Sequence, residues 1–233
     1  MTETDASATE AAPDPAVAAA NAAAEAFIGK WRGVPASELS TSQSFLLDLC
    51  ALLGVDAPHA TPEHDYLFER PVTFRHGDGS TSAGRIDLYR RGAFVLESKR
   101  LKAGAHTKGF DEALLRARSQ AENYARALPA AEGRPPFLVV VDVGQRIELY
   151  SEFSRSGATY TPFPDPRSHR IALDDLRRSD IRERSAIGHG TVKGVHKKGT
   201  NADNTMYSIA QHDHHPGEPA IVIHSGKALT RTR

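Results

Sequence analysis

The sequence predicts an α/β fold with a mixed central sheet flanked by helices, a disordered N-terminal leader and an irregular C-terminal tail. Three observations support this fold class: helical spacing of apolar residues in 41–54 and 110–128, strand-like patterns in 65–75 and 84–99, and the continuous apolar run FLVVVDVG from residue 137. With 233 residues, of which 39% are hydrophobic, the chain can bury one core of moderate size.

Turn and cap residues place the boundaries of the expected elements. Gly54 ends the first helix, the turn HGDGS at 76–80 ends the first strand, and Arg91-Gly92 closes a hairpin. The expected order is a helix at 38–53, a strand at 65–75, a hairpin at 84–100, a helix at 110–128, strands at 137–144 and 146–153, and a closing helix at 171–184.

Composition divides the chain into three parts. Residues 1–25 are rich in Ala, Pro, Thr and acidic residues, which predicts a disordered leader with at most a helical turn near its end. Residues 26–184 have the apolar content and the helix and strand patterns of a folded domain. Residues 185–233 contain one Leu, no Phe and no Trp, and hold six of the eleven His of the chain. This tail is therefore expected to be either a disordered extension or an out-of-frame translation product.

Charge and hydropathy limit the classes of partner. No run of 18 or more apolar residues exists and the N-terminal residues are acidic, so we expect a cytoplasmic protein that does not enter a membrane. The net charge is zero, so this chain alone should bind DNA only weakly. The only cysteine, Cys50, lies among leucines at helical spacing and is interpreted as a small buried hydrophobe.

The segment GRIDLYRRGAFVLESKR, residues 84–100, places charged residues within a strongly β-prone hairpin. Glu97 and Lys99 are two apart on a strand and must point to the same face. The turn at Arg91-Gly92 brings Asp87 opposite Leu96 or, with one bulge, opposite Glu97.

Two carboxylates and a backbone carbonyl at Ser98 would form the all-oxygen pocket that Mg²⁺ prefers, and Mn²⁺ could replace it. Lys99 could then hold the attacking water and stabilise the charge that builds on phosphorus. This pattern predicts metal-assisted phosphodiester hydrolysis with Asp87, Glu97 and Lys99 as catalytic residues. The alternative is a structural hairpin in which the two carboxylates are ordinary ion-pair partners of Lys99, Arg85 or Arg100.

The order of elements around this hairpin resembles the PD-(D/E)XK restriction-endonuclease-like core. On the following helix, Gln120 and Tyr124 are four residues apart and share one face. This pair resembles the Gln-x-x-x-Tyr element of RecB-like nucleases, and the resemblance implies that it helps to position nucleic acid. The alternative is a core-facing Tyr124 beside an incidental Gln120.

The spacing of Asp87 from Glu97-Ser98-Lys99, together with FLLDLCALLGV, YLFERPV and GRIDLYRRGAFVLESK, resembles the N-terminal endonuclease segment of MmeI-like type IIL restriction-modification enzymes. The similarity covers roughly residues 26–184. It implies that Asp87 and Glu97 are metal ligands and that Lys99 is the catalytic amine. Glu38 and Glu69 are candidate outer carboxylates, although a solvated surface role fits each of them as well.

The chain departs from that family's pattern because it has no Asn-Pro-Pro-Tyr motif and no glycine-rich cofactor loop. We therefore expect no S-adenosylmethionine site, and a truncated protein that lacks the methyltransferase and target-recognition domains. A separately encoded methyltransferase or specificity fragment would then be a partner, beside double-stranded DNA. The alternative function is a catalytically inactive remnant or DNA-binding module. The tail residues His212, His214 and His215 give a weaker pattern for zinc.

Overall fold

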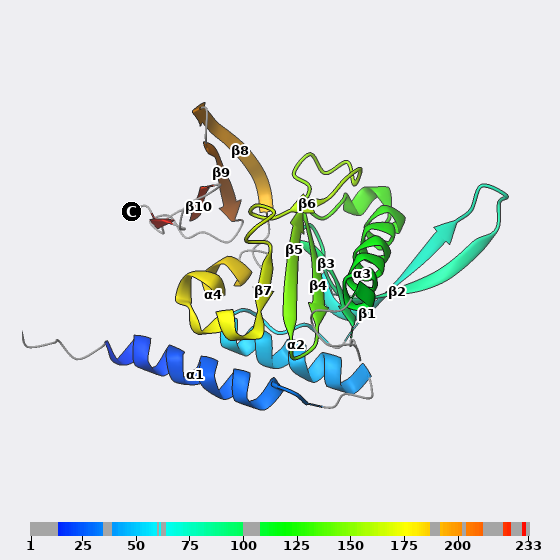
Figure 1. The fold of residues 1–233 in the computed structure, drawn as a ribbon. Helices are drawn as coiled ribbons and strands as arrows, with labels where there is room; N and C mark the ends of the chain where they lie inside the picture. The colour runs from blue at the N-terminus through cyan, green and yellow to red at the C-terminus, as the bar shows by residue number, and fades with distance from the viewer. Residues whose placement is uncertain are drawn as a thin grey trace, which may run out of the picture.

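The computed structural model describes residues 14–34, 39–59, 61, 64–99 and 108–186, and the backbone of four strands after residue 191. Its centre is a seven-stranded sheet in the order β1-β2-β3-β4-β5-β6, with β7 also paired to β5 (Figure 1). The strands are β1 Tyr66–Arg75, β2 Thr81–Arg90, β3 Phe94–Lys99, β4 Phe137–Asp142, β5 Arg146–Ser151, β6 Thr161–Pro162 and β7 Arg170–Ala172.

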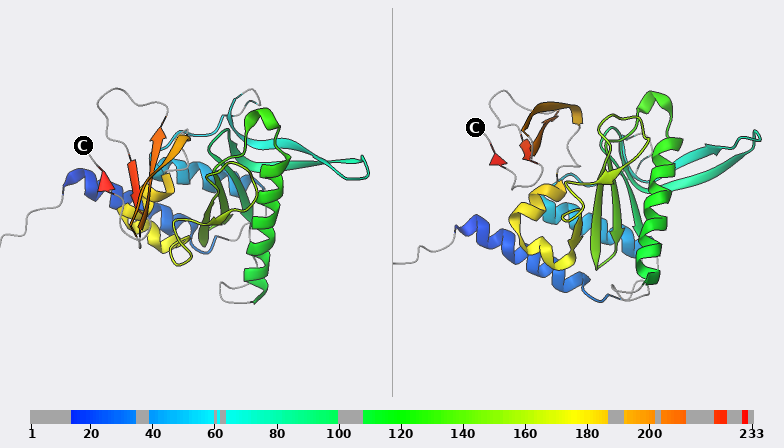
Figure 2. Two further views of the ribbon diagram at one scale, coloured as in Figure 1. Left: turned by 90° about the horizontal axis from the view of Figure 1, so that it is seen from above. Right: turned by 45° about the horizontal axis from the view of Figure 1, so that its top comes forward.

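Helices cover both faces of this sheet (Figures 1 and 2). Helix α3, Lys108–Ala127, packs on one face and supplies the crossover that the parallel pair β3–β4 requires. The other face packs against α1 Pro15–Trp31, α2 Leu39–Leu53 and α4 Ser179–Ala186. The mixed sheet with helices on both faces confirms the predicted fold class.

Two separate clusters of buried side chains correspond to these two faces. Leu114, Ala117 and Ala121 of α3 pack with Leu138 and Val140 of β4. In the other cluster, apolar residues of α1, α2 and α4 pack against strand side chains that point to the opposite face of the sheet. The alternation of side chains along each strand therefore decides which helix layer a residue meets.

Helix α1 begins at Pro15, so residues 15–25 are helical where the sequence predicts a disordered leader. The Asp14 side chain accepts a hydrogen bond from the backbone N–H of Ala16, and Pro15 occupies a first-turn position where its missing N–H costs nothing. Alanine favours helix, and Ala24 is fully buried. Residues 1–13 lie outside the described part of the chain.

The predicted closing helix at 171–184 is wrong in its first half. Strand β7 and a 3₁₀ turn, Leu173–Arg177, precede the short helix α4. Ile171 pairs with Ile147 of β5 and is buried in the sheet, which keeps this segment extended. The Asp175 side chain then accepts a hydrogen bond from the Ala172 N–H, where the 3₁₀ turn begins.

The chain after residue 191 forms a second sheet in the order β11-β10-β9-β8. Its strands are β8 Val192–Asn201, β9 Asn204–Gln211, β10 Ile221–His224 and β11 Thr230–Arg231. The origin of the tail stays a prediction, and the candidate zinc residues His212, His214 and His215 lie outside the described residues. No helix in the described ranges is both long and apolar enough to cross a membrane.

Strands β1 and β2 continue beyond the body of the domain as a two-stranded arm (Figures 1 and 2). The arm ends in a tight turn in which the His76 N–H donates to the Ser80 carbonyl. At the base of the arm Gly84 lies against ring atoms of Phe74 and Tyr124, 2.7 Å from where a Cβ would stand. The base of the arm is therefore packed against α3.

Candidate functional site

Strands β1 and β2 both change face at the same point. Leu67 and Val72 of β1 belong to the cluster under α3, although they are five positions apart and regular alternation would put them on opposite faces; the same holds for Ile86 and Tyr89 of β2, which are three positions apart. The register pairs Phe68 with Leu88 and Arg70 with Ile86, and it omits the pair between them. Each strand therefore has an irregularity at this position.

The omitted pair consists of Glu69 and Asp87. Glu69 has a φ of 55°, in the left-handed region that side chains with a Cβ rarely adopt. This local distortion breaks the alternation of both strands. It places two carboxylates opposite each other where the arm joins the body of the sheet.

Strand β3 continues this row of carboxylates. The ladder between β2 and β3 ends at Leu88 and Leu96, and one further step of the same register would place Asp87 opposite Glu97. Because Leu96 pairs with Leu88, the ladder excludes the placement of Asp87 opposite Leu96, and its continuation favours the placement opposite Glu97. Where the ladder ends, the Asp87 carboxylate accepts two hydrogen bonds from Ser98, from its backbone N–H and its hydroxyl, each 2.7 Å long.

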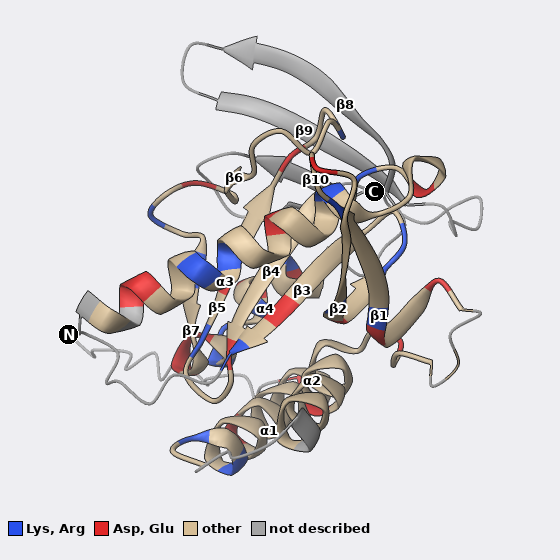
Figure 3. Ribbon diagram, turned by 90° about the vertical axis from the view of Figure 1, so that its right-hand side faces the viewer, with Lys and Arg blue, Asp and Glu red and all other residues tan. Residues whose placement is uncertain are grey.

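Glu97 and Lys99 lie two and four positions after Val95, which packs in the cluster with α3, so alternation places both on that face of β3. Figure 3 shows α3 lying across the sheet in front of β3 and β4. The Lys99 Nζ donates to Glu97 Oε1 at 2.6 Å. The Glu97 side chain is 1% exposed and the Lys99 side chain is 34% exposed. The amine therefore stands at the surface above a buried carboxylate, as the spacing of the two residues predicts.

Burial, and then repulsion among the carboxylates, raises the pKa values of two of these acids. Burial raises the pKa of Glu97 to about 7, and the negative charges of Asp87 and Glu69 add to the effect, while Lys99 opposes it. Burial, and then the charge of Asp87, also raises the pKa of Glu69. Three acidic groups with one nearby amine form a site that a cation would stabilise.

The predicted site residues are thus largely brought together. Asp87, Glu97, Ser98 and Lys99 meet at the end of the β2–β3 ladder. Glu69 joins them as an electrostatic neighbour of both acids. Glu38 lies outside the described residues, so its role as an outer carboxylate stays a prediction.

The fit of these residues to a metal ion can be tested on their oxygen atoms. Glu97 Oε2 and Glu69 Oε1 are buried and have no hydrogen-bond partner among the described residues. Asp87 and Glu97 use Oδ2 and Oε1 in the bonds already given, which leaves one oxygen of each for a ligand. Magnesium sites often use one or two carboxylates, with water and phosphate completing the shell, and these residues fit that pattern.

The described residues do not, however, include a group of three His, Cys, Asp or Glu side chains arranged to hold a metal by themselves. A magnesium ion here would depend on a backbone oxygen such as that of Ser98, on water and on substrate. Such a site would bind the free ion weakly.

Gln120 and Tyr124 lie together on α3. The Gln120 amide donates to the Tyr124 hydroxyl at 2.8 Å. Tyr124 is only 8% exposed, and its ring stacks on Phe74 of the arm at 5.7 Å between centroids. Tyr124 is therefore core-facing, as the alternative interpretation holds, while contact of this pair with nucleic acid stays a prediction.

Two further buried acids lie next to the site. Both are outside the hairpin at 84–100, so the hairpin motif does not predict them. Val140 of β4 pairs with Glu97 on one side and with Glu148 of β5 on the other, so the two glutamates share a row about 10 Å apart. Glu148 accepts from the Tyr150 hydroxyl and forms an ion pair with Arg170. An acid inside the apolar run IELY could have indicated it.

Asp142 is the second such residue. It is fully buried and pairs with Lys99 across the parallel β3–β4 ladder. The run FLVVVD places this acid at the end of a strand, but only the order of strands in the sheet shows that Lys99 is its neighbour. Together with Glu148, it extends the acidic surroundings of the amine.

Comparison with known proteins gives one match. No curated protein and no solved structure matches the chain. The model of the family described as MmeI, N-terminal domain, matches residues 19–193, which is most of the chain. The match contains the arm, the carboxylate row and α3, and it begins and ends outside the predicted limits of 26 and 184. The chain therefore belongs to the MmeI N-terminal domain family, the N-terminal region of MmeI-like type IIL restriction enzymes.

Proposed function

We propose that this domain is a Mg²⁺-dependent endonuclease that hydrolyses phosphodiester bonds of double-stranded DNA. The observation that carries the proposal is the meeting of Asp87, Glu97 and Lys99 at the point where β2 and β3 separate. Two acids and one amine at the open end of a ladder offer both a cation site and a proton-donating group to a phosphate. Mn²⁺ could replace Mg²⁺ because it takes similar oxygen ligands.

Each residue has a distinct role in this proposal. Asp87 and Glu97 would hold the ion, together with the Ser98 carbonyl, and the ion would supply Lewis-acid stabilisation of the phosphate charge. The bonds from Ser98 fix the orientation of the Asp87 carboxylate. Lys99, half-exposed beside Glu97, would orient the attacking water and donate hydrogen bonds to the phosphate oxygens.

The proposal extends to the partners. The domain at 26–184 contains no Asn-Pro-Pro-Tyr motif, so target recognition and methylation would come from a unit other than this domain, such as the separately encoded fragment expected above. Cutting by this chain alone would then be slow and without sequence preference. The protein would act in the cytoplasm, on double-stranded DNA.

A second candidate is a catalytically inactive DNA-binding remnant, and two observations favour it. The Glu97–Lys99 ion pair and the Asp87–Ser98 bonds satisfy part of the site internally. In addition, no self-sufficient metal cluster exists in the part of the chain that the structure describes. Activity measurements separate the two candidates.

The decisive experiment is nicking of supercoiled plasmid in Mg²⁺ or Mn²⁺. We expect the wild-type protein to nick the plasmid. The nicking rates of Asp87→Ala and Lys99→Ala should be at least about 100-fold lower, because general acid–base catalysis and electrostatic stabilisation each contribute about that much. Asp56→Ala is the matched control, since the Asp56 side chain is 83% exposed and far from the ladder end in sequence. Equal nicking by all four proteins would show that another site or a contaminant cuts the plasmid.

Metal binding should be measured separately from cutting. Millimolar Mg²⁺ should raise the melting temperature of the wild-type protein and of Lys99→Ala, because anything that binds only the folded state stabilises it. Asp87→Ala should lose this increase. No difference between Asp87→Ala and Asp56→Ala in this measurement would remove Asp87 from the metal site.

A further inference from the structure

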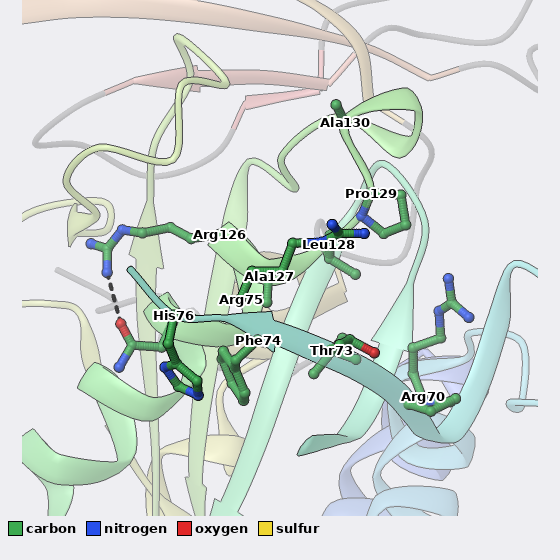
Figure 4. A pocket seen from close by; sticks show the side chains of 13 residues that line it. Arg70, Thr73, Phe74, Arg75, His76, Arg126, Ala127, Leu128, Pro129 and Ala130 are labelled. Atoms are coloured by element: carbon green, nitrogen blue, oxygen red, sulfur yellow. Dashed lines mark hydrogen bonds between the residues drawn. The ribbon is translucent and has the colours of Figure 1, made fainter. Parts of the chain in front are cut away.

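A wide groove lies between strand β1 and the C-terminal end of α3 (Figure 4). Its volume is about 920 Å³. Residues 70–76 line one wall, and residues 126–130 with Asn123 line the other. The lining contains no Asp or Glu, but it includes Arg70, Arg75, Arg126 and His76.

The three arginines of the groove differ in how far their charges are balanced. Arg70 forms an ion pair with Glu132, whose side chain is only 13% exposed. Arg126 forms an ion pair with Glu122 at 3.1 Å, although its own side chain remains 43% exposed. Arg75 is exposed and forms no ion pair with any residue that the structure describes. The groove therefore keeps an excess of positive charge, and Arg75 is its main source.

The groove and the carboxylate row are linked through β1. Arg70, at one end of the groove wall, directly follows Glu69 in this strand, although the carboxylates themselves do not line the groove. From Arg70 to Arg75 the extended strand covers about 17 Å at roughly 3.4 Å per residue. This is about the axial rise of five base pairs of duplex DNA, at 3.4 Å per phosphate of one strand.

The wall formed by β1 is held in place by α3. The Phe74 ring stacks on Tyr124, and the Tyr124 hydroxyl accepts a hydrogen bond from Gln120. Gly84 of the paired strand lies close enough to both rings that a Cβ there would approach them to 2.7 Å. The Gln120–Tyr124 pair therefore fixes the arm, and with it the width of the groove, without being exposed itself.

Resting on the nuclease function proposed above, we propose that this groove binds the phosphate backbone of double-stranded DNA and leads it to the carboxylate row. Arg75 contacts a phosphate directly, while Arg70 and Arg126 contribute charge from positions held by their protein partners. The open shape and the three arginines of the walls, with no acidic residue in the lining, suit a continuous polyanion better than an enclosed small molecule. Contacts of this kind set position and affinity but carry no sequence information.

The test is equilibrium binding of a fluorescent 24-base-pair duplex to the full chain in EDTA, measured over a range of salt concentrations. Each phosphate contact contributes about 0.9 to the slope of log Kd against log salt. Arg75→Ala should lower this slope by about that amount and weaken binding severalfold at low salt. Arg116→Ala is the matched control, because Arg116 lies on α3 outside the groove and its side chain is 71% exposed.

A gain-of-charge variant guards against effects on folding. Thr73 lines the same wall, and Thr73→Arg should tighten binding and steepen the slope. The proposed DNA-binding groove would be rejected if Arg75→Ala had the same affinity and salt slope as Arg116→Ala. It would also be rejected if Thr73→Arg had the same affinity and salt slope as the wild type. Tighter binding of a single-stranded 24-mer than of the duplex would overturn the assignment to double-stranded DNA.

The outcome is independent of the nicking experiment. If the plasmid is cut while Arg75→Ala binds normally, the nuclease stands and the groove is rejected. If the wild type never nicks but Arg75→Ala loses affinity relative to Arg116→Ala, the groove stands and the nuclease is rejected.

Discussion

Glu97 is the residue at which the requirements of folding and of the candidate site conflict. Its carboxylate is almost fully buried, and one amine donates a hydrogen bond to it. Burial and the neighbouring acids raise its pKa to about 7. A buried charge without full compensation lowers stability, so Glu97 is better explained by a ligand than by a contribution to folding.

This conflict predicts how stability depends on pH in the absence of metal. Between the ordinary pKa of 4.5 and about 7, folded Glu97 keeps a proton that the unfolded chain releases. The free energy of unfolding therefore falls as the pH rises through this window, by at most about 3 kcal/mol, and then levels off. Glu97→Gln should lack this loss.

Urea unfolding in EDTA at several pH values checks the prediction. Near the lower end of the window the wild type and Glu97→Gln should be similarly stable, and the variant should become the more stable protein as the pH reaches 7 and above. Asp56→Ala should track the wild type throughout, because its side chain is exposed. A difference between wild type and Glu97→Gln that does not change with pH would contradict the raised pKa.

At the same scale, some site residues were predictable and others were not. Strand alternation alone places Glu97 and Lys99 on one face, and the hairpin turn brings Asp87 near them. Glu69 has a left-handed backbone, and nothing local in the sequence predicts it. Glu148 becomes a neighbour only through the order β3-β4-β5, which the sequence does not reveal.

Among the elements, the β1–β2 arm packs on α3 at its base and extends away from the body toward its tip. Its base is packed on α3 through Phe74 and Tyr124, and Gly84 allows both rings to approach the strand. The tip, in contrast, is a polar turn around Gly77 and Asp78, with no heavy atom within 4 Å of a Cβ built on Gly77. Packing therefore requires a residue without a side chain at Gly84, whereas it sets no such requirement at Gly77.

Alanine substitutions at these two glycines test that difference. Gly84→Ala should lower the free energy of unfolding by about 1–3 kcal/mol, because the added methyl group forces the rings or the strand to move. Gly77→Ala should change it by less than about 0.5 kcal/mol. Urea unfolding followed by circular dichroism measures both. Equal stability of the two variants would show that the arm is not held against α3 as described.

The two elements that the sequence mispredicts have different physical causes. Helix α1 is rich in alanine, and only a few large side chains, among them Phe27 and Trp31, mark its buried face. Its first turns are exposed and follow from alanine propensity and the Asp14 cap, which a composition-based prediction of disorder overlooks. The segment at 171–184 has helical spacing, but tertiary pairing with β5 overrides it and keeps its first residues extended.

Taken as one body, the domain separates its stabilising core from its candidate site. The face covered by α1, α2 and α4 is almost entirely apolar, whereas the face under α3 carries the buried acids. Helix α1 belongs to the first of these layers. Phe27 and Trp31 pack on Phe45 of α2, and the Trp31 indole N–H donates to Asp48.

If α1 is an integral layer of the domain, it should unfold together with the sheet. Trp31 is the only tryptophan of the chain and is 4% exposed, so its fluorescence reports on this layer, while circular dichroism reports on all elements. The two urea transitions should coincide, as expected for a single cooperative unit.

Phe27→Ala should shift both midpoints by the same amount, corresponding to about 3–5 kcal/mol, because it leaves a cavity against Phe45. Val17→Ala, at a 51% exposed position of the same helix, should shift neither. A fluorescence transition that precedes the circular dichroism transition would instead make α1 a separately docked segment.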